Sequence, residues 1–245
     1  MNLLEVQGLR KTYPAFRLED VSFSVPEGAV MGLIGRNGAG KSTTLKSILG
    51  LVHPDAGRVE MFGREFSENE RYIKENIGVV LGGIDFYPKK KVRTITDVTR
   101  RFYSNWQEEK YRHYLDLFAI DENKRVDQLS SGMRVKYLLA LALSHNARLL
   151  ILDEPTSGLD PVSRDELTEL LRRIAVDGTR SVLFSTHITS DLEKCASHIT
   201  FIQEGRLQRS DTLAGFMAHY ADLGSTLEEI IVAAERRPYD ADAII

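Results

Sequence analysis

The sequence predicts an α/β fold: a mostly parallel sheet covered by helices, with an N-terminal antiparallel β subdomain and an inserted helical subdomain. Three observations predict it. In the second half, short apolar runs alternate with helical patterns, which is typical of parallel strands buried on both faces. The N-terminal segment alternates apolar and polar side chains, as strands with one solvated face do. Residues 94–146 change to helical periodicity.

The N-terminal elements are strands separated by turn residues. We expect strands at residues 3–6 and 17–25, and the second of them ends at the turn sequence Pro26-Glu27-Gly28. A further strand is expected at residues 58–62, where Gly63 ends it. The alternation favours antiparallel pairing for this segment.

A glycine-rich loop joins a buried strand to a helix. The apolar run at 30–34 precedes GRNGAGKS, and residues 42–49 then read as a helix that Gly50 closes. The pattern G-x-x-x-x-G-K-[ST] cradles phosphates: glycines let backbone N–H groups approach the anion, the lysine reaches the outer phosphates, and the hydroxyl faces Mg²⁺. The helix N-terminus adds a positive dipole end. The residues expected to bind the nucleotide here are Gly35, Asn37, Gly38, Ala39, Gly40, Lys41, Ser42 and Thr43.

Strands and helices alternate again after residue 147. Strands are expected at 76–81, 148–152, 180–185 and 198–203, and helices at 161–176 and 189–195. Glu204-Gly205 reads as a hairpin turn.

Polar residues follow two of these apolar strands. Ligands of open α/β sheets lie outside the carboxyl ends of the strands. Asp153 there suits Mg²⁺, and Glu154 suits a general base for an attacking water. Alternatively, both acids only begin a loop that caps the helix near Pro161. His187 follows the 180–185 strand and could reach the γ-phosphate, although a lone histidine is usually structural.

The helical region has aromatic and aliphatic stripes that we expect to form a core of its own. Its members are Phe102, Trp106, Tyr114, Leu115, Leu117 and Phe118. Leu129-Ser130-Ser131-Gly132-Met133 precedes an apolar helix that runs to about residue 145. This segment could form a second anion-binding surface, but the residues alone favour a plain N-cap.

Composition limits the classes of function. The 245-residue chain carries a formal net charge of −3, which does not support binding of nucleic acid. One cysteine, Cys195, excludes a disulfide within the chain and is expected to be buried. No apolar run approaches the roughly 18 residues that a membrane span needs, and no signal-peptide pattern opens the chain.

These motifs together resemble the nucleotide-binding subunit of an ATP-binding cassette (ABC) transporter. GRNGAGKST and LLILDE resemble Walker A and Walker B, LSSGM lies where the family carries its LSGGQ signature, and SGLD, ending at Asp160, resembles the D-loop. His187 is similar to the switch histidine, and Tyr13 to the aromatic residue that stacks on adenine. The resemblance implies a RecA-like P-loop NTPase fold. It implies one ABC ATPase domain over 1–245, with 1–84 and 147–245 as the ATP-binding core plus β subdomain, and 85–146 as the helical subdomain.

The resemblance also implies a mechanism. Two subunits, taken as a homodimer, would bind ATP and Mg²⁺ head to tail. Each ATP would lie between Lys41, Ser42, Asp153 and Glu154 of one copy and Ser130, Ser131 and Gly132 of the other. Lys41, Glu154 and His187 would be catalytic, and hydrolysis would drive a separate transmembrane permease from the cytoplasmic face of the membrane. Alternatives are a soluble ABC-type ATPase acting on ribosomes or DNA, and a non-hydrolysing nucleotide sensor.

The sequence departs from the family pattern at three positions. Gly82 stands where the family usually has a glutamine, Ser131 replaces a glycine of the signature, and Met133 replaces its glutamine. We expect slower or weaker dimer closure from Ser131, because its Cβ and hydroxyl occupy space needed for close backbone approach. Other details resemble exporter-like drug- and peptide-resistance subunits. By resemblance, residues 82–92 would face the permease, with Phe86 and Tyr87 as candidate contacts. Alternatively, these two side chains simply pack against the helical subdomain.

Overall fold

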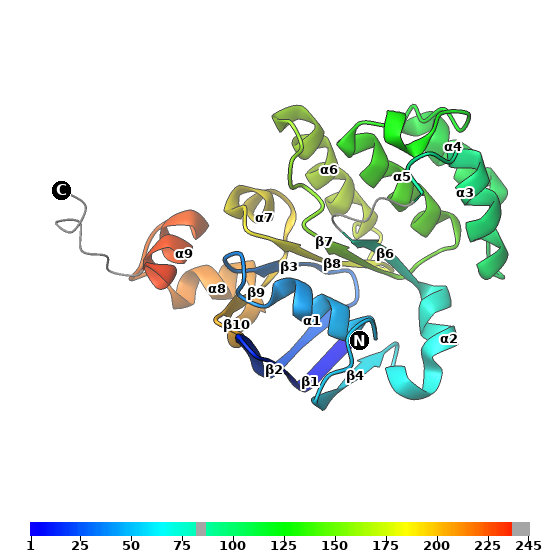
Figure 1. Cartoon of the computed structure of the whole chain (residues 1–245). Helices are drawn as coiled ribbons and strands as arrows, with labels where there is room; N and C mark the ends of the chain where they lie inside the picture. Colours follow the sequence, from blue (N-terminus) through cyan, green and yellow to red (C-terminus); the bar gives the residue numbers. More distant parts are fainter. Residues whose placement is uncertain (82–86, 237–245) are drawn as a thin grey trace.

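The strands form one strongly curled sheet, seen in a computed structural model that describes residues 1–81 and 87–236 (Figure 1). Within those residues the sheet has ten strands in the order β5-β4-β1-β2-β10-β9-β3-β8-β7-β6. The mixed α/β class predicted from the sequence is confirmed. The sheet has an antiparallel portion at one end and a parallel portion at the other.

The antiparallel portion is built from the N-terminal segment. Strand β1 (Asn2–Tyr13) pairs antiparallel with β2 (Phe16–Pro26) and with β4 (Ala56–Met61). The short β5 (Arg64–Glu65) extends it beyond β4. Along β2, the apolar side chains point to one face and are buried: Leu18, Val21, Phe23 and Val25. The alternation in the sequence therefore predicted this pairing correctly.

The parallel portion contains the strands whose carboxyl ends are followed by the candidate site residues. Strand β3 (Val30–Ile34) pairs parallel with β8 (Ser181–Thr186) on one side and β9 (His198–Gln203) on the other. Strand β8 pairs with β7 (Leu149–Asp153), and β7 pairs with β6 (Ile77–Leu81). Because β3, β8, β7 and β6 run in the same direction, their carboxyl ends meet along one edge.

Strand β10 (Arg206–Thr212) closes the sheet. It forms an antiparallel hairpin with β9 through the turn at residues 204–205, as the sequence predicted. It also joins β2 through one parallel pairing, Arg206 with Glu19. The two portions of the sheet are linked at this point.

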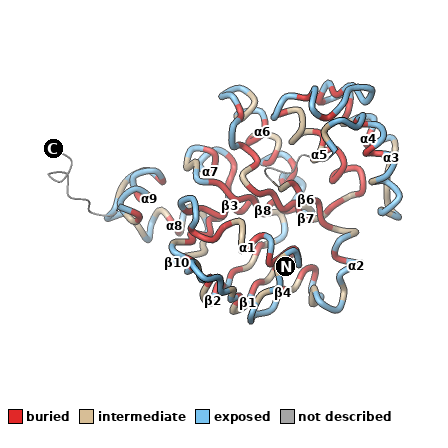
Figure 2. The backbone as a smooth tube through the Cα atoms, in the orientation of Figure 1, coloured by how far each residue is buried: buried red, intermediate tan, exposed pale blue. Residues whose placement is uncertain are grey.

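Helices cover both faces of the parallel strands. In Figure 2 the residues of β3, β8 and β7 are coloured as buried, and the outer segments are largely exposed. On one face, α1 (Lys41–Ile48) packs with the antiparallel strands. On the other lie α6 (Pro161–Ile174) and α7 (Thr189–Cys195). Alternate residues of β7 enter the two cores: Leu149 and Ile151 the first, Leu150 and Leu152 the second.

The remaining helices include one that the sequence pattern did not predict. Helix α2 (Phe66–Asn76) precedes β6, and only Ile73 of it is buried. At the other end of the chain, α8 (Leu213–His219) and α9 (Leu227–Glu235) pack on the core that contains α7. In the described part of the chain, no helix is both long and apolar enough to cross a membrane.

A helical segment with its own core lies between β6 and β7. It contains α3 (Val92–Thr99), α4 (Glu108–Leu117) and α5 (Ser131–Ser144), with short 3-10 turns at Arg100–Phe102 and Val126–Gln128. Its buried cluster centres on Val92, Tyr111, Leu115 and Tyr137. The division at residues 84/85 stays a proposal, because that boundary lies outside the described residues.

Two residues expected in this core are not in it. Phe102 is 73% exposed and Leu117 is 60% exposed, so the prediction for them was wrong. In α4, Leu115 and the following Phe118 face inward, and a helix turns about 100° per residue, which places Leu117 on the outer side. Phe102 ends the 3-10 turn after α3, outside the inward stripe. Cys195 is buried as expected, and burial raises the pKa of its thiol to about 12.

Candidate active site

The phosphate loop leaves the carboxyl end of β3 and enters α1. It lies against the β9–β10 hairpin, since Gly205 N–H donates to the Ala39 carbonyl at 2.9 Å. A Cβ at Gly35 would sit 2.1 Å from the Ile202 carbonyl oxygen, so only glycine allows this approach. Gly40 precedes α1 with φ 113°, a conformation that other residues rarely adopt. The loop therefore has the shape that its glycines predicted.

Lys41 points back into the loop. Its side chain is 5% exposed, and Nζ donates to the carbonyl oxygens of Gly35 at 2.7 Å and of Arg36 at 3.3 Å. The same Nζ lies 3.1 Å from Glu154 Oε1. That contact is an ion pair without hydrogen-bond geometry, because Oε1 has no hydrogen-bond partner in the described residues. Lys41 thus holds a positive charge at the centre of the loop, with a carboxylate beside it.

Asp153 ends β7 next to the first turn of α1. Its Oδ1 accepts hydrogen bonds from Ser42 Oγ at 3.1 Å and from Ser185 Oγ at 2.6 Å. The carboxylate is 7% exposed. A carboxylate and a hydroxyl held together are the oxygen donors that Mg²⁺ uses beside phosphate oxygens and waters. The structure therefore brings together the two residues predicted to hold the metal.

Glu154 and His187 meet at the same edge of the sheet. Glu154 Oε2 lies 2.9 Å from Nδ1 of His187, which follows β8. Glu154 has φ 48°, and a non-glycine residue in this left-handed region is strained. Such strain is concentrated at functional sites. Lys41, Glu154 and His187, predicted from three separate segments, form one contiguous polar group.

Ser185 is a residue of this site that sequence reasoning missed. Its Oγ donates to Asp153 Oδ1 and accepts the Glu154 N–H at 2.9 Å, so one hydroxyl holds the carboxylate of Asp153 and the backbone of Glu154. Ser185 is fully buried and pairs with Asp153 in the β7–β8 register. The only signal in the sequence was a polar residue at the end of an otherwise apolar strand.

A cavity of about 450 Å³ opens over the phosphate loop and Glu154. Its walls come from the phosphate loop, from the turn between β1 and β2, and from Glu154. The lining residues are Ala15, Phe16, Arg36, Asn37, Gly38, Gly40, Lys41, Ser42, Thr43 and Glu154. The cavity lies where the phosphates of a nucleotide would meet the positive end of α1.

Comparison with known proteins identifies the family. The family described as ABC transporter matches residues 18–157. The bacitracin transport ATP-binding protein BcrA of Bacillus licheniformis is 32% identical over 208 residues, 84% of this chain and 68% of that protein. The chain belongs to the ABC transporter family. The resemblance drawn from the motifs is confirmed, and this chain is an ATP-binding subunit whose reaction is ATP hydrolysis.

Other similar proteins agree with this assignment. The Nod factor export ATP-binding protein I of Burkholderia orbicola (strain AU 1054) is 38% identical over 191 residues, 76% of this chain and 62% of that protein. A solved ATP-binding subunit of an ABC transporter is 28% identical with a TM-score of 0.85, covering 96% of this chain and all of that one. The ABC ATPase fold therefore extends over nearly the whole chain.

The ABC signature segment lies at the start of α5. Ser130 is the N-cap residue, and its side chain accepts the Met133 N–H at 3.2 Å. Ser131 is exposed at the first helical position. Gly132 is buried, and a Cβ on it would lie 3.3 Å from Ser163 Cβ of α6. None of the three is among the residues that line the described cavity at the phosphate loop.

The D-loop residue Asp160 is the N-cap of α6. Its Oδ1 accepts the N–H groups of Val162 and Ser163, each at 3.0 Å. Hydrogen bonds from Ser163, followed by one from Val162, hold the pKa of the Asp160 carboxyl below its ordinary value. The Asp160 carboxylate thus stabilises α6, the helix against which Gly132 of the signature segment packs.

One aromatic residue was expected to stack on adenine. Tyr13 ends β1 with its ring partly exposed, and the ammonium of Lys11 lies 5.8 Å from the ring centroid. Phe16 lines the cavity beside the phosphate loop, which sequence reasoning missed. The stacking role of Tyr13 stays a prediction, and Gly82 and Phe86 lie outside the described residues.

Proposed function

We propose that this chain is the nucleotide-binding subunit of an exporter-like ABC transporter, in which two copies close over ATP and Mg²⁺ and hydrolysis reopens them. The observation that carries the proposal is the group formed by Lys41, Glu154 and His187 at the carboxyl ends of adjacent strands. This group places a phosphate-binding cation within 3.1 Å of a carboxylate that can accept a proton from water.

Lys41 and Glu154 exchange partners in this proposal. The triphosphate competes with Glu154 for the Lys41 ammonium, because phosphate oxygens carry more charge than one carboxylate. Glu154 is then released to accept a proton from the attacking water. His187 holds Glu154 Oε2 and orients it toward the γ-phosphate.

Ser42 and Asp153 would hold Mg²⁺. Both contribute oxygen donors already within hydrogen-bond distance of each other, and Ser185 orients the carboxylate from the far side. When bound, the metal neutralises charge on the phosphates. Asp153 and Glu154 are consecutive residues with different roles. Asp153 would bind the metal, and Glu154 would accept the proton of the attacking water.

The second copy would complete the site. The signature helix α5 begins with backbone N–H groups and a positive dipole end, yet its first residues lie away from the phosphate loop of the same chain. A head-to-tail pair brings Ser130, Ser131 and Gly132 of one copy to the γ-phosphate bound by the other. ATP then joins the two surfaces. Its hydrolysis breaks the bond to the γ-phosphate, so that the phosphate can leave and the surfaces can part.

A permease would dock on the helical segment. Between β6 and the helices α3 and α5 lies a groove of about 570 Å³. Apart from Lys90, Thr94, Thr99 and His145, the side chains that line it are apolar or aromatic. Several of these are exposed, namely Val79, Tyr87, Val98 and Phe102. Contiguous exposed apolar surface of this kind marks an interaction site. We propose that a cytoplasmic helix of a separate transmembrane permease occupies it, which places this chain on the cytoplasmic face of the membrane.

The names of two relatives bear on the direction of transport. One relative is a bacitracin transport protein and another a Nod factor export protein, so we propose that the cargo is exported rather than taken up. Selectivity would lie in the permease.

The test uses the chain co-expressed and purified with its membrane partner. We expect Mg²⁺-dependent phosphate release, abolished by Glu154→Gln, together with an ATP-dependent dimer of that variant on sedimentation. Phosphate release that needs no membrane partner and no dimer would favour a soluble ATPase. ATP binding without any phosphate release would favour a nucleotide sensor.

A further inference from the structure

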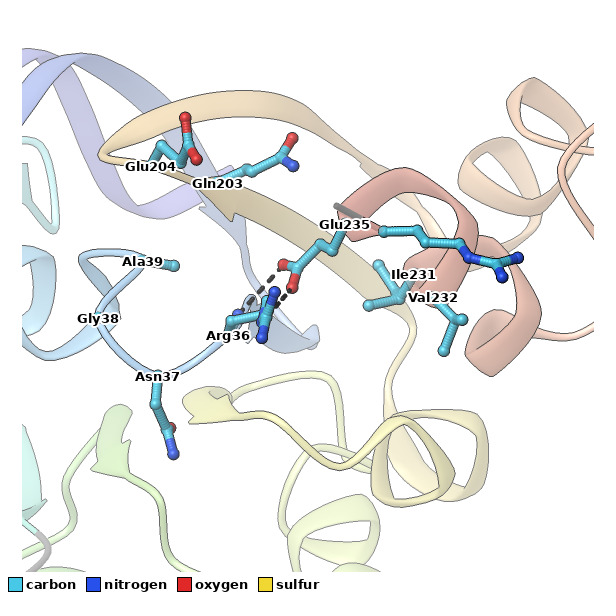
Figure 3. Close-up of a pocket in the computed structure, with 10 residues that line it drawn as sticks. Arg36, Asn37, Gly38, Ala39, Gln203, Glu204, Ile231, Val232 and Glu235 are labelled. Atoms are coloured by element: carbon cyan, nitrogen blue, oxygen red, sulfur yellow. Dashed lines mark hydrogen bonds and ion pairs between the residues drawn. The ribbon is translucent and has the colours of Figure 1, made fainter. Parts of the chain in front are cut away.

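The C-terminal helix α9 ends against the phosphate loop (Figure 3). Glu235, its last residue, accepts the Arg36 N–H through Oε1 at 3.1 Å, and its Oε2 lies 3.6 Å from Arg36 Nε. The Glu235 side chain is only 6% exposed, whereas that of Arg36 is 65% exposed. A buried carboxylate therefore holds the backbone of the phosphate loop at its second residue.

Helix α9 is itself fixed to the ATP-binding core. Its apolar side chains Leu227 and Ile230 are fully buried in the core that contains α7. The Leu227 N–H donates to Glu193 Oε1 at 2.9 Å, and Gln203 Nε2 donates to the Ala234 carbonyl at 3.1 Å. Glu235 therefore reaches the loop from a docked helix and not from a free end.

Both backbone polar groups of Arg36 are hydrogen-bonded. Glu235 accepts its N–H, while its carbonyl oxygen accepts hydrogen bonds from Lys41 Nζ at 3.3 Å and from the Ala39 N–H at 3.0 Å. Lys41 in turn pairs with Glu154. One chain of contacts thus runs from α9 through Arg36 and Lys41 to the proposed catalytic base.

Burial of the Glu235 carboxylate is unfavourable for its charged form, because the side chain loses contact with water. Burial raises the pKa of Glu235, and the Arg36 N–H and the charges of Arg36 and Lys41 oppose that rise. A negative charge close to the phosphate loop also repels a triphosphate. Its contribution to nucleotide binding is therefore the hydrogen bond to the Arg36 backbone rather than attraction of the ligand by charge.

We propose that Glu235 is a positioning residue for the nucleotide: it ties α9 to the phosphate loop through the Arg36 peptide, so that docking of α9 and binding of ATP favour each other. The inference rests on the proposed ATP site. Because coupling between two sites is reciprocal, displacement of α9 weakens ATP binding and ATP strengthens the docking of α9.

The first test separates the hydrogen bond from the charge. Glu235→Gln keeps an oxygen acceptor and removes the charge, whereas Glu235→Ala removes both. With the full-length chain and its membrane partner, we expect Glu235→Ala to raise KM for MgATP about tenfold, with kcat within about threefold of wild type. Glu235→Gln should stay within about threefold in both. Glu228→Ala, at an exposed position of the same helix, is the matched control and should change neither.

A second measurement needs no variant. Amide hydrogen exchange in α9 should slow when MgADP binds the wild-type chain, and this protection should persist in Glu235→Gln. Equal KM changes in Glu235→Gln and Glu235→Ala, or no KM change in Glu235→Ala, would overturn the inference. So would nucleotide binding that leaves exchange in α9 unchanged. If wild type retains no nucleotide at all, the proposed ATP site fails, and the coupling fails with it.

Discussion

Removal of the Ser185 hydroxyl tests whether one group holds the carboxylate of Asp153 and the backbone of Glu154. Ser185→Ala removes the hydrogen bond to Asp153 Oδ1 and leaves the Glu154 N–H without its acceptor at a fully buried position. A bond to a carboxylate contributes about 1.5–3 kcal/mol and a neutral one about 1 kcal/mol. We therefore expect about 2.5–4 kcal/mol of lost stability and at least a tenfold fall in kcat/KM, with a higher Mg²⁺ requirement.

Ser181→Ala is the control for this change. Ser181 is equally buried on the same strand β8, but its hydroxyl donates only to the Pro26 carbonyl, at 2.8 Å. It should lose about 1 kcal/mol in urea unfolding and keep its Mg²⁺ dependence. Phosphate release at a series of Mg²⁺ concentrations compares the two variants. If Ser185→Ala and Ser181→Ala lose the same activity for each kcal/mol of lost stability, the Ser185 hydroxyl does not position Asp153 and Glu154 and the reasoning is refuted.

Four further predictions follow from the site. Glu154→Gln should bind ATP yet lose about 10²–10⁴-fold in turnover, and near-normal phosphate release would assign the base elsewhere. Lys41→Ala should abolish tight ATP binding in a fluorescent-nucleotide titration, and unchanged affinity would contradict the phosphate-loop assignment. Ser131→Gly should tighten the ATP-dependent dimer, which sedimentation checks against wild type. The pKa of Asp160 is lowered in the folded chain, so its stabilisation of α6 is present above the ordinary value of 3.8 and lost as pH falls through the folded value. Urea unfolding of wild type and Asp160→Ala should accordingly converge in strongly acidic solution, and a difference that persists there would rule out the carboxylate cap.

Local patterns predicted most of the elements because their signals are short-range. The glycine loop at 35–42, the apolar strand before Asp153 and the turn at 204–205 each depend on a few consecutive residues. Helix α2 was not predicted from the sequence because it is largely polar. Only Ile73 of this helix is buried, so the sequence shows no apolar stripe there. Phe102 and Leu117 were misplaced because hydrophobicity shows that a residue can be buried and not that it is.

The composition of the sequence and the order of its motifs determined the family, the α/β class and the residues proposed to bind phosphate and metal, since these depend on residue types at fixed spacing along one chain. Only the tertiary structure decided which residues distant in the sequence form hydrogen bonds with them. Ser185 reaches Asp153 through the register of two parallel strands, and Glu235 reaches Arg36 across 199 positions because α9 folds back on the core. Such contacts leave no local pattern, because the partner comes from packing and not from neighbouring sequence.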